Sequence, residues 1–233
     1  MRIAILSDLH ANLPALKAVL DHAGPVNDLF CLGDLVDYGP QPKEVISEIR
    51  QRATQTLRGN HDQALAYDMD CGCALVFRPL SLETRAYHKT LLGPEDIAYL
   101  RALPLSHRAE LGGARFFLCH ASPQGDLFRY LRPSVAEEIW RSELSGIEAD
   151  LIFTGHTHLP MIKRIGHQQV INPGSVGQPR DGDPKASYAL WEDGKVMLRR
   201  VAYPVEETIA ALKHSPLQRE SIELLCAILK RGK

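Results

Sequence analysis

The sequence of 233 residues contains no long apolar run: no segment approaches the roughly 18 uninterrupted apolar residues of a membrane-spanning helix. It also lacks an excess of either charge, since 27 Lys and Arg stand against 28 Asp and Glu. No overall field therefore attracts nucleic acid or an anionic membrane. Because Met1-Arg2-Ile3 runs directly into a predicted strand without a signal-peptide pattern, we expect a cytoplasmic protein.

Cysteine is scarce, and the five cysteines are an odd number. Cys31 and Cys119 fall in predicted buried strands, which fits a reduced compartment better than a disulfide framework. Cys71 and Cys73 are separated only by Gly72 and lack a second pair. A structural zinc site and a redox-sensitive pair both remain open for these two residues.

What the sequence does contain is a set of five short segments that carry carboxylate, imidazole and amide groups. They are Asp8-Leu9-His10, Gly33-Asp34, Gly59-Asn60-His61-Asp62, Cys119-His120 and Gly155-His156-Thr157-His158. Each segment alone is typical of a turn or a helix cap, because Asp favours both. Together they hold five of the ten histidines, which indicates a shared site. We expect the other five histidines, His88 among them, to be surface or packing residues.

Seven of these side chains are candidate metal ligands: Asp8, His10, Asp34, Asn60, His120, His156 and His158. The set mixes nitrogen and oxygen without thiolate, which favours a hard or borderline divalent ion. Seven ligands exceed what one ion needs, and a carboxylate can bridge two ions about 3.5–4 Å apart. Two carboxylates beside two divalent ions leave a positive site that suits a phosphate. We expect two ions, Mn²⁺ in the first place, with Fe, Zn, Ni or Mg as alternatives.

Every segment follows directly on a stretch with the pattern of a buried strand. These stretches are Arg2 to Ser7, Asp28 to Leu32, Thr54 to Leu57, Phe116 to Cys119 and Leu151 to Thr154, with helices predicted over Leu13 to Asp21 and Pro42 to Arg52. Loops at the carboxyl ends of strands in an α/β sheet converge on one edge. We therefore expect the candidate ligands to meet.

The ordered set Asp-x-His, Gly-Asp, Gly-Asn-His-Asp, His-Ala-Ser and Gly-His-Thr-His resembles the calcineurin-like metallophosphoesterase superfamily, and residues 172–180 resemble its compact prokaryotic branch. The resemblance spans residues 1 to about 200. It implies an α/β or α+β fold, a four-layer sandwich of two mixed β-sheets flanked by helices. It implies one ion on Asp8, His10, Asp34 and His158, a second on Asp34, Asn60, His120 and His156, and a bridging water as nucleophile.

His61 is the motif histidine outside that ligand set, and the resemblance implies that it faces the substrate. We expect it to protonate the leaving-group oxygen or to stabilise the charge that develops there. Asp62 is expected to orient the His61 ring; a helix N-cap is the alternative.

Three further residues are candidates for substrate binding. Arg180 and Arg58 could clamp a phosphate, because a guanidinium offers a planar fork of donors. A surface salt bridge is the alternative for Arg180, and a structural role is the alternative for Arg58. Asn12 either caps the first helix, which we favour, or contacts the substrate.

Between Asp62 and about Glu110 the alternation of strand and motif stops, and helices are predicted over Leu82 to Leu92 and Pro94 to Leu103. We expect a helical cap insertion at about 63–110 within a single domain, 1–233. Tyr67, Phe77 and Tyr87 could line a pocket under this cap or fill its core. Later strands are expected at 187–191 and 196–201, and closing helices at 204–213 and 217–230. The last helix should pack on the body or on another subunit of a homo-oligomer.

The sequence predicts a metal-dependent hydrolase of a small phosphate ester, with phosphodiesters as the favoured substrates and a nucleotide as one option. A dinucleoside polyphosphate hydrolase and a serine/threonine protein phosphatase-like enzyme are the alternatives, because residues 33–40 resemble those groups as well. A non-catalytic scaffold of the same fold is disfavoured, since His61 and all seven ligands are retained. Neutral charge and a small cap argue against an extended nucleic acid as partner.

Overall fold

Two five-stranded mixed sheets pack face to face in the computed structural model, which describes residues 1–233. The first sheet has the order β10-β9-β1-β2-β3 and the second has the order β4-β5-β6-β8-β7. The strands of the first sheet are β1 (Arg2–Leu6), β2 (Asp28–Cys31), β3 (Gln55–Thr56), β9 (Ala186–Glu192) and β10 (Lys195–Val201). Those of the second are β4 (Ser106–Leu111), β5 (Ala114–Cys119), β6 (Leu151–Phe153), β7 (Met161–Ile165) and β8 (Gln168–Asn172).

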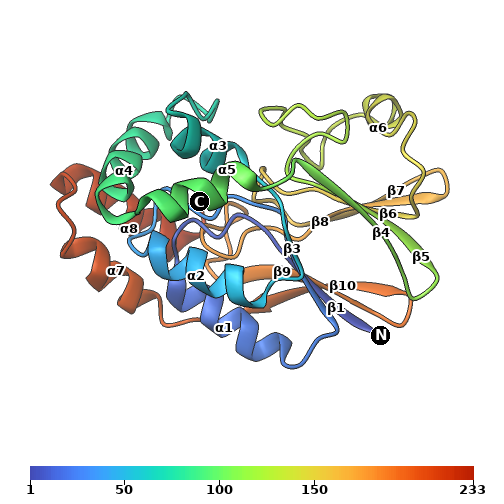
Figure 1. The fold of residues 1–233 in the computed structure, drawn as a ribbon, viewed down its shortest axis with the longest axis horizontal. Helices are drawn as coiled ribbons and strands as arrows, with labels where there is room; N and C mark the ends of the chain where they lie inside the picture. Colours follow the sequence, from blue (N-terminus) through green and yellow to red (C-terminus); the bar gives the residue numbers. More distant parts are fainter.

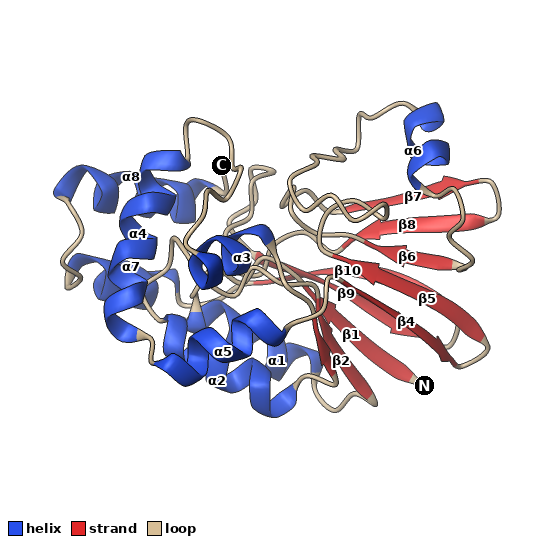
Figure 2. Ribbon diagram, turned by 45° about the horizontal axis from the view of Figure 1, so that its top comes forward, coloured by secondary structure: helices blue, strands red, loops and turns tan.

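Eight helices flank the two sheets. They are α1 (Leu13–Ala23), α2 (Pro42–Arg52), α3 (Asn60–Tyr67), α4 (Arg78–Leu91), α5 (Pro94–Ala102), α6 (Glu137–Glu143), α7 (Val205–Lys213) and α8 (Arg219–Arg231). Seven of them gather on one side of the strands, while α6 lies apart beside the second sheet (Figure 1, Figure 2). None of the helices combines the length and the apolar character needed to cross a membrane.

The central strand β1 is buried on both faces, which explains its continuous apolar sequence. Ile3 and Ile5 point into a core between the two sheets, where Phe116 and Phe153 of the second sheet stack. Ala4 and its neighbours on the other face pack against α1 and α2. A third core lies under Trp140 of α6. The four layers therefore run helices, sheet, sheet, helix, and the predicted sandwich is confirmed.

The elements that the sequence analysis missed have polar or short patterns. Strand β4 reads Ser-His-Arg-Ala-Glu-Leu, is half exposed throughout and pairs antiparallel with β5 at an edge of the second sheet. Strand β7 forms the other edge, has five residues and includes the charged Lys163 and Arg164. Charged, polar edge strands carry little hydrophobic signal. Within the region predicted as a cap insertion, 63–110, the helical segment ends before Ser106, and β4 belongs to the sheet.

The helical segment α3–α5 joins the helix layer of the domain. Leu92, Leu100 and Leu103 share one core with residues of α1 and α2. The last helix, α8, packs on the body, because Leu225 and Leu229 are buried with Tyr38 and with residues of α7. The helices α3–α5 and the helix α8 thus pack against the loops that follow the strands.

The approach of two loops at the end of β1 requires a glycine. The Gly177 amide donates to the Asp8 carbonyl at 3.0 Å, so the loop after β8 lies directly on the loop after β1. A Cβ at position 177 would overlap the carbonyl oxygen of Leu9, which is backbone and cannot rotate away. The two sheets are joined here through glycine.

We expect Gly177→Ala to lower the free energy of unfolding by about 1–3 kcal/mol, the usual cost of overpacking a well-packed region. Denaturant unfolding of the metal-free protein measures this loss. Gly93→Ala is the matched control, because position 93 has a φ of −86° and its nearest neighbour would be 3.9 Å from the new Cβ. Equal stability of the two variants would contradict the assigned role of Gly177.

Candidate metal centre

The five sequence motifs meet at one edge of the sandwich, where the carboxyl ends of the central strands lie. β1 and β2 run parallel in one sheet, and β5 and β6 run parallel in the other. The loops that follow them lie between the strands and the helices (Figure 2). All seven candidate ligands are buried, with at most 3 % of any residue exposed. The fold thus delivers residues that are 148 positions apart in the sequence to a common point, as the backbone N–H of His156 shows by donating to the Asp8 carboxylate at 3.1 Å.

The first group of ligands comprises Asp8, His10, Asp34 and His158, whose ligand atoms lie within 4.8 Å of one another. The Nε2 atoms of His10 and His158 are 3.1 Å apart, and His158 Nε2 is 3.3 Å from Asp8 Oδ1. Each ring donates from Nδ1 to a backbone carbonyl, His10 to Val36 at 2.8 Å and His158 to Gln178 at 2.6 Å. The Nε2 atoms therefore face each other as lone pairs.

The second group comprises Asp34, His120 and His156, again within 4.8 Å, together with the amide of Asn60. Asn60 Oδ1 lies 3.0 Å from His120 Nε2 and 2.9 Å from His156 Nδ1. The amide is oriented by its nitrogen, which donates to the Cys71 carbonyl at 2.7 Å. His120 is oriented in the same way as the first two histidines, since its Nδ1 donates to the Leu32 carbonyl at 2.9 Å.

Asp34 belongs to both groups. Its Oδ1 accepts the backbone N–H of His61 at 2.9 Å. Its Oδ2 is buried without a hydrogen-bond partner and lies 3.3 Å from His120 Nε2 and 3.8 Å from His10 Nε2. A buried carboxylate oxygen without a partner is costly unless a cation or a donor compensates it. Its position makes it the shared oxygen between the two groups.

The backbone at this site is strained. Asp8, His10, Asp34, His156 and His158 all have φ values between 45° and 65°, a region that residues other than glycine rarely adopt. Such outliers persist only where the surrounding structure holds them, and they cluster at functional sites. In this conformation Asp8 and His10 of one loop, and His156 and His158 of another, direct their side chains toward the same site.

The donor set fits metal ions. Burial lowers the pKa of His10 to about 3 and the pKa of His158 well below its usual value, so both rings are neutral. Neutral rings whose Nε2 lone pairs face each other and a carboxylate cannot hydrogen-bond, and a cation between them satisfies all three. Burial alone would lower the pKa of His120, but the Asp34 charge raises it to about 9. A metal bound there would displace that proton, as is usual for imidazole ligands.

His61 lies beside the ligands and is held by Asp37, which the sequence analysis did not single out. His61 Nδ1 donates to Asp37 Oδ2 at 2.7 Å, and Arg85 of α4 bonds the same oxygen at 2.7 Å. Burial opposes a charge on the ring, but the nearby Asp34 charge and the Asp37 hydrogen bond outweigh it and raise the pKa of His61. Ser81 Oγ also donates to Asp37, at 2.8 Å. The His61 ring is thus fixed and kept ready to carry a proton.

Asp62 does not orient His61, so that expectation is wrong. Its carboxylate accepts the backbone N–H groups of Asp34, Leu35 and Gly59 at 2.8 to 2.9 Å. The last of these bonds runs from the N-cap residue, Gly59, to Asp62 at position N3, so Asp62 helps to cap α3 but is not itself the N-cap of the alternative interpretation. Asp62 ties the loop after β2 to the loop after β3.

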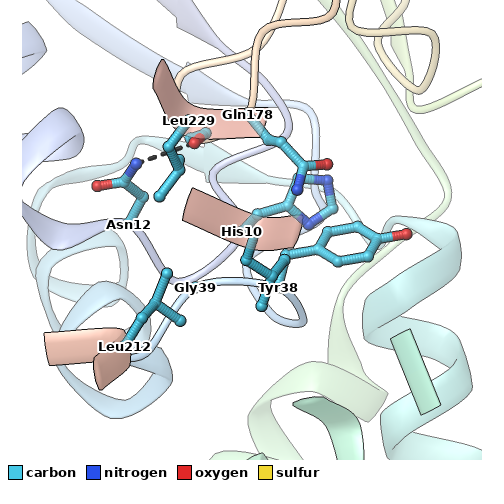
Figure 3. A pocket seen from close by; sticks show the side chains of 9 residues that line it. His10, Asn12, Tyr38, Gly39, Gln178, Leu212 and Leu229 are labelled. Carbon is cyan, nitrogen blue, oxygen red and sulfur yellow. Dashed lines mark hydrogen bonds between the residues drawn. The ribbon is translucent and has the colours of Figure 1, made fainter. Parts of the chain in front are cut away.

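Arg58 and Asn12 are also engaged away from the metal ligands. Arg58 donates to the carbonyl of Arg101 at 2.9 Å and lies against the Tyr67 ring, contacts that fit the structural role named as its alternative. Asn12 is buried and caps α1 by accepting the N–H of Ala15 at 3.2 Å. Its amide donates to the Gly177 carbonyl at 2.9 Å, turned away from the Tyr38 ring in a cavity of about 10 Å³ (Figure 3). This cavity has no room for a substrate.

Arg180 does lie at an open cavity beside the metal ligands. The cavity has a volume of about 270 Å³ and is lined by Ala74, Phe77, Tyr130, Arg132, Thr157, Leu159, Arg180 and Lys233. Arg180 stacks on Phe77, 3.9 Å from the ring centroid. The Tyr130 ring lies 4.0 Å from that of His156, which connects this cavity to the second ligand group. Of the three aromatic residues predicted for a pocket, only Phe77 lines it: Tyr67 is exposed and Tyr87 packs against the core of α7 and α8.

The cysteines divide as the sequence suggested. Cys31 and Cys119 are buried and unpaired in the strands, which confirms their role as core residues. Cys71 and Cys73 lie in the loop between α3 and α4, where a ring nitrogen of His61 is within 4.8 Å of both sulfurs. His88, expected in packing or at the surface, is fully buried and supports the site loop through Asp37 and Gly39.

Comparison with known proteins agrees with this geometry. The family model described as calcineurin-like phosphoesterase superfamily domain matches residues 1–193. An uncharacterised protein of Methanocaldococcus jannaschii is 32% identical over 88% of this chain and 89% of its own. Phosphodiesterase YfcE of Escherichia coli K12 is 26% identical over 93% of this chain and 100% of its own.

A solved structure extends the likeness to the whole fold. The metallophosphoesterase of Sphaerobacter thermophilus superimposes with a TM-score of 0.84 and 33% identity, covering 100% of this chain and 99% of that one. The family match covers all five motifs and both groups of ligands. The chain belongs to the calcineurin-like phosphoesterase superfamily, a family of metal-dependent hydrolases of phosphate esters.

Proposed function

We propose that this protein is a phosphodiesterase that uses two divalent metal ions. The observation that carries the proposal is the unpartnered Asp34 Oδ2, which faces both ligand groups at 3.3 and 3.8 Å. One ion would be held by Asp8, His10, Asp34 and His158, the other by Asp34, Asn60, His120 and His156. The mixed oxygen and nitrogen donors favour Mn²⁺, with Fe, Zn, Ni or Mg as alternatives. When bound, the ions would acidify water and neutralise charge on the phosphoryl oxygens.

His61 would supply the proton that the leaving group needs. Against the effect of burial, the Asp34 charge and the Asp37 hydrogen bond raise its pKa, which favours the protonated ring, and Asp37 fixes its orientation through Nδ1. Protonation of the departing oxygen removes the need to expel a basic alkoxide. Retention of this histidine and of every ligand supports an enzyme in preference to a non-catalytic scaffold.

The preference for diesters is supported by a relative and by the surroundings of the site. The sequence match to phosphodiesterase YfcE covers 93% of this chain. The cavity beside His156 has room for the second substituent that a diester carries and a monoester lacks. Arg180, which lines this cavity, offers donors for the phosphate itself.

A second candidate is hydrolysis of a dinucleoside polyphosphate. The same cavity is lined by three cationic side chains, Arg132, Arg180 and Lys233, and by no acidic one. Phe77 and Tyr130 add two aromatic rings on which a nucleobase could stack. This lining favours a substrate with further phosphates and an aromatic group beyond the scissile bond.

Metal removal tests the proposal. The chelated, metal-free protein should be inactive on bis(p-nitrophenyl) phosphate, and Mn²⁺ should restore activity with two ions per chain by elemental analysis. Asp34→Ala should bind less than one ion per chain, because both groups lose a ligand. A dinucleoside polyphosphate in the same panel separates the two candidate substrates. Full activity after verified metal removal would exclude the two-metal mechanism.

A second experiment tests the role of His61 through the leaving group. His61→Ala should keep both ions but lower kcat by roughly 10²–10⁴ on diesters with basic leaving groups. An activated leaving group such as p-nitrophenol departs without a proton, so the loss there should be much smaller. The ratio of the two losses is the measurement. Comparable losses would indicate instead that His61 stabilises the phosphoryl oxygens.

A third experiment tests the control of His61 by Asp37. Asp37→Asn should lower the pKa of His61 in the metal-free protein, measured by NMR titration of the imidazole. A pKa that is higher in the folded than in the unfolded state stabilises the fold below the unfolded value of about 6.5, and this contribution is lost as the pH rises through the folded value. The pH-dependent part of the stability lost in Asp37→Asn should therefore be largest at acidic pH and vanish at alkaline pH.

Asp62→Asn is the matched control for that experiment. Its carboxylate bonds three backbone N–H groups and does not contact the ring. We expect Asp62→Asn to lower the free energy of unfolding by about 1–3 kcal/mol, the cost of unsatisfied buried donors, and to leave the pKa of His61 nearly unchanged. An identical pKa of His61 in wild type and Asp37→Asn would overturn the assigned pairing.

A further inference from the structure

Two cysteines lie beside the catalytic centre and take no part in the proposed hydrolysis. Cys71 and Cys73 belong to the loop between α3 and α4, are 2 % and 8 % exposed and form no disulfide. The motif ligands contain no thiolate, so this pair adds a different kind of donor to the same site. A pair of thiols one residue apart can act as a chelate for a cation that prefers sulfur.

The geometry brings His61 into the same group. One ring nitrogen of His61 and the sulfurs of Cys71 and Cys73 lie within 4.8 Å of one another. In a tetrahedral zinc-like site, bonds of about 2.3 Å to sulfur and about 2.0–2.1 Å to nitrogen place the donor atoms roughly 3.4–3.8 Å apart. A contraction of about an ångström would therefore suffice to close the three donors around an ion.

The loop that carries the thiols is held in place on both sides. A Cβ on Gly72 would lie 2.5 Å from the Phe128 ring, so the turn between the cysteines is packed against that side chain. The Cys71 carbonyl accepts the amide of Asn60 at 2.7 Å. Cys71 Sγ also lies 3.3 Å from Ser81 Oγ, which accepts from the Arg85 guanidinium at 2.6 Å. A guanidinium in this network favours the thiolate form that binds metals.

We propose that Cys71, Cys73 and His61 form a third, inhibitory site for a thiophilic divalent cation of the zinc and cadmium class. Binding would release the two thiol protons, and any proton on the ligating ring nitrogen, to solvent. An ion on the nitrogen that faces the active site would remove the proton donor, and an ion on Nδ1 would displace the bond to Asp37. Either arrangement ends acid catalysis by His61.

The experiment uses Cd²⁺ with the Mn²⁺-loaded protein under a thiol-free reductant. Two readouts are followed: the cadmium–thiolate charge-transfer absorption in the ultraviolet, which reports binding, and diester hydrolysis, which reports inhibition. We expect one Cd²⁺ per chain to produce the absorption, to abolish turnover on a substrate with a basic leaving group and to leave Mn²⁺ bound. In Cys71→Ser/Cys73→Ser the absorption should vanish, and inhibition should need at least tenfold more Cd²⁺.

Cys226→Ser is the matched control, because this half-buried cysteine lies on α8 and should leave both readouts unchanged. ¹¹³Cd NMR of the wild-type protein reports sulfur ligation without any substitution, in case the double variant does not fold. Absorption that persists in the double variant, a ¹¹³Cd signal of nitrogen and oxygen ligation, or inhibition matched by release of Mn²⁺ would overturn the proposal.

The inhibitory part of this inference rests on the proposed hydrolysis, whereas the binding part does not. A protein that hydrolyses no phosphate ester but gives the thiolate absorption only with both cysteines present would refute the proposed function and keep the cation site. An active enzyme that does not give the absorption would refute the cation site and keep the proposed function.

Discussion

The site brings together buried nitrogen and oxygen atoms that can each donate an electron pair but have no hydrogen-bond donor between them. The Nε2 lone pairs of His10 and His158 face each other at 3.1 Å, and Asp34 Oδ2 is buried without a partner. Without cations this arrangement is unfavourable, because desolvated acceptors repel one another. It is held by the backbone, since each of these rings is fixed through Nδ1 to a carbonyl. Burial of the apolar core between the two sheets stabilises the fold and offsets the unfavourable free energy of this arrangement.

The meeting of the candidate ligands could be predicted from the sequence because each of them stands next to the signal that positions it. A buried strand such as Arg2 to Leu6 has a strong apolar pattern, and Asp8 and His10 follow it directly. Strand direction then decides where those side chains meet, and the parallel pairs β1–β2 and β5–β6 place their ends at one edge. The ligand positions thus needed only local patterns and one rule of sheet geometry.

The partners of His61 could not be predicted in the same way. Asp37 lies further along the loop after β2, outside the recognised motif, and Arg85 comes from α4, so their contact exists only after the helices pack on the site. Asp62 is adjacent to His61 in the chain, yet its side chain turns back to the backbone of Asp34 and Leu35. Proximity in sequence was a poor guide here, because consecutive residues at the start of a helix point in different directions.

The candidate ligands and the residues that line the cavity come from different parts of the fold. The candidate metal ligands stand just after strand ends and are fixed by backbone contacts in the interior. Several side chains that line the open cavity come from longer connections: Tyr130 and Arg132 from the segment between β5 and α6, and Arg180 from the loop between β8 and β9. Loops tolerate substitution and insertion better than strands. The sandwich can therefore keep one metal chemistry while its cavity adapts to different groups on the phosphate, which is why the motifs specify the reaction class more closely than the substrate.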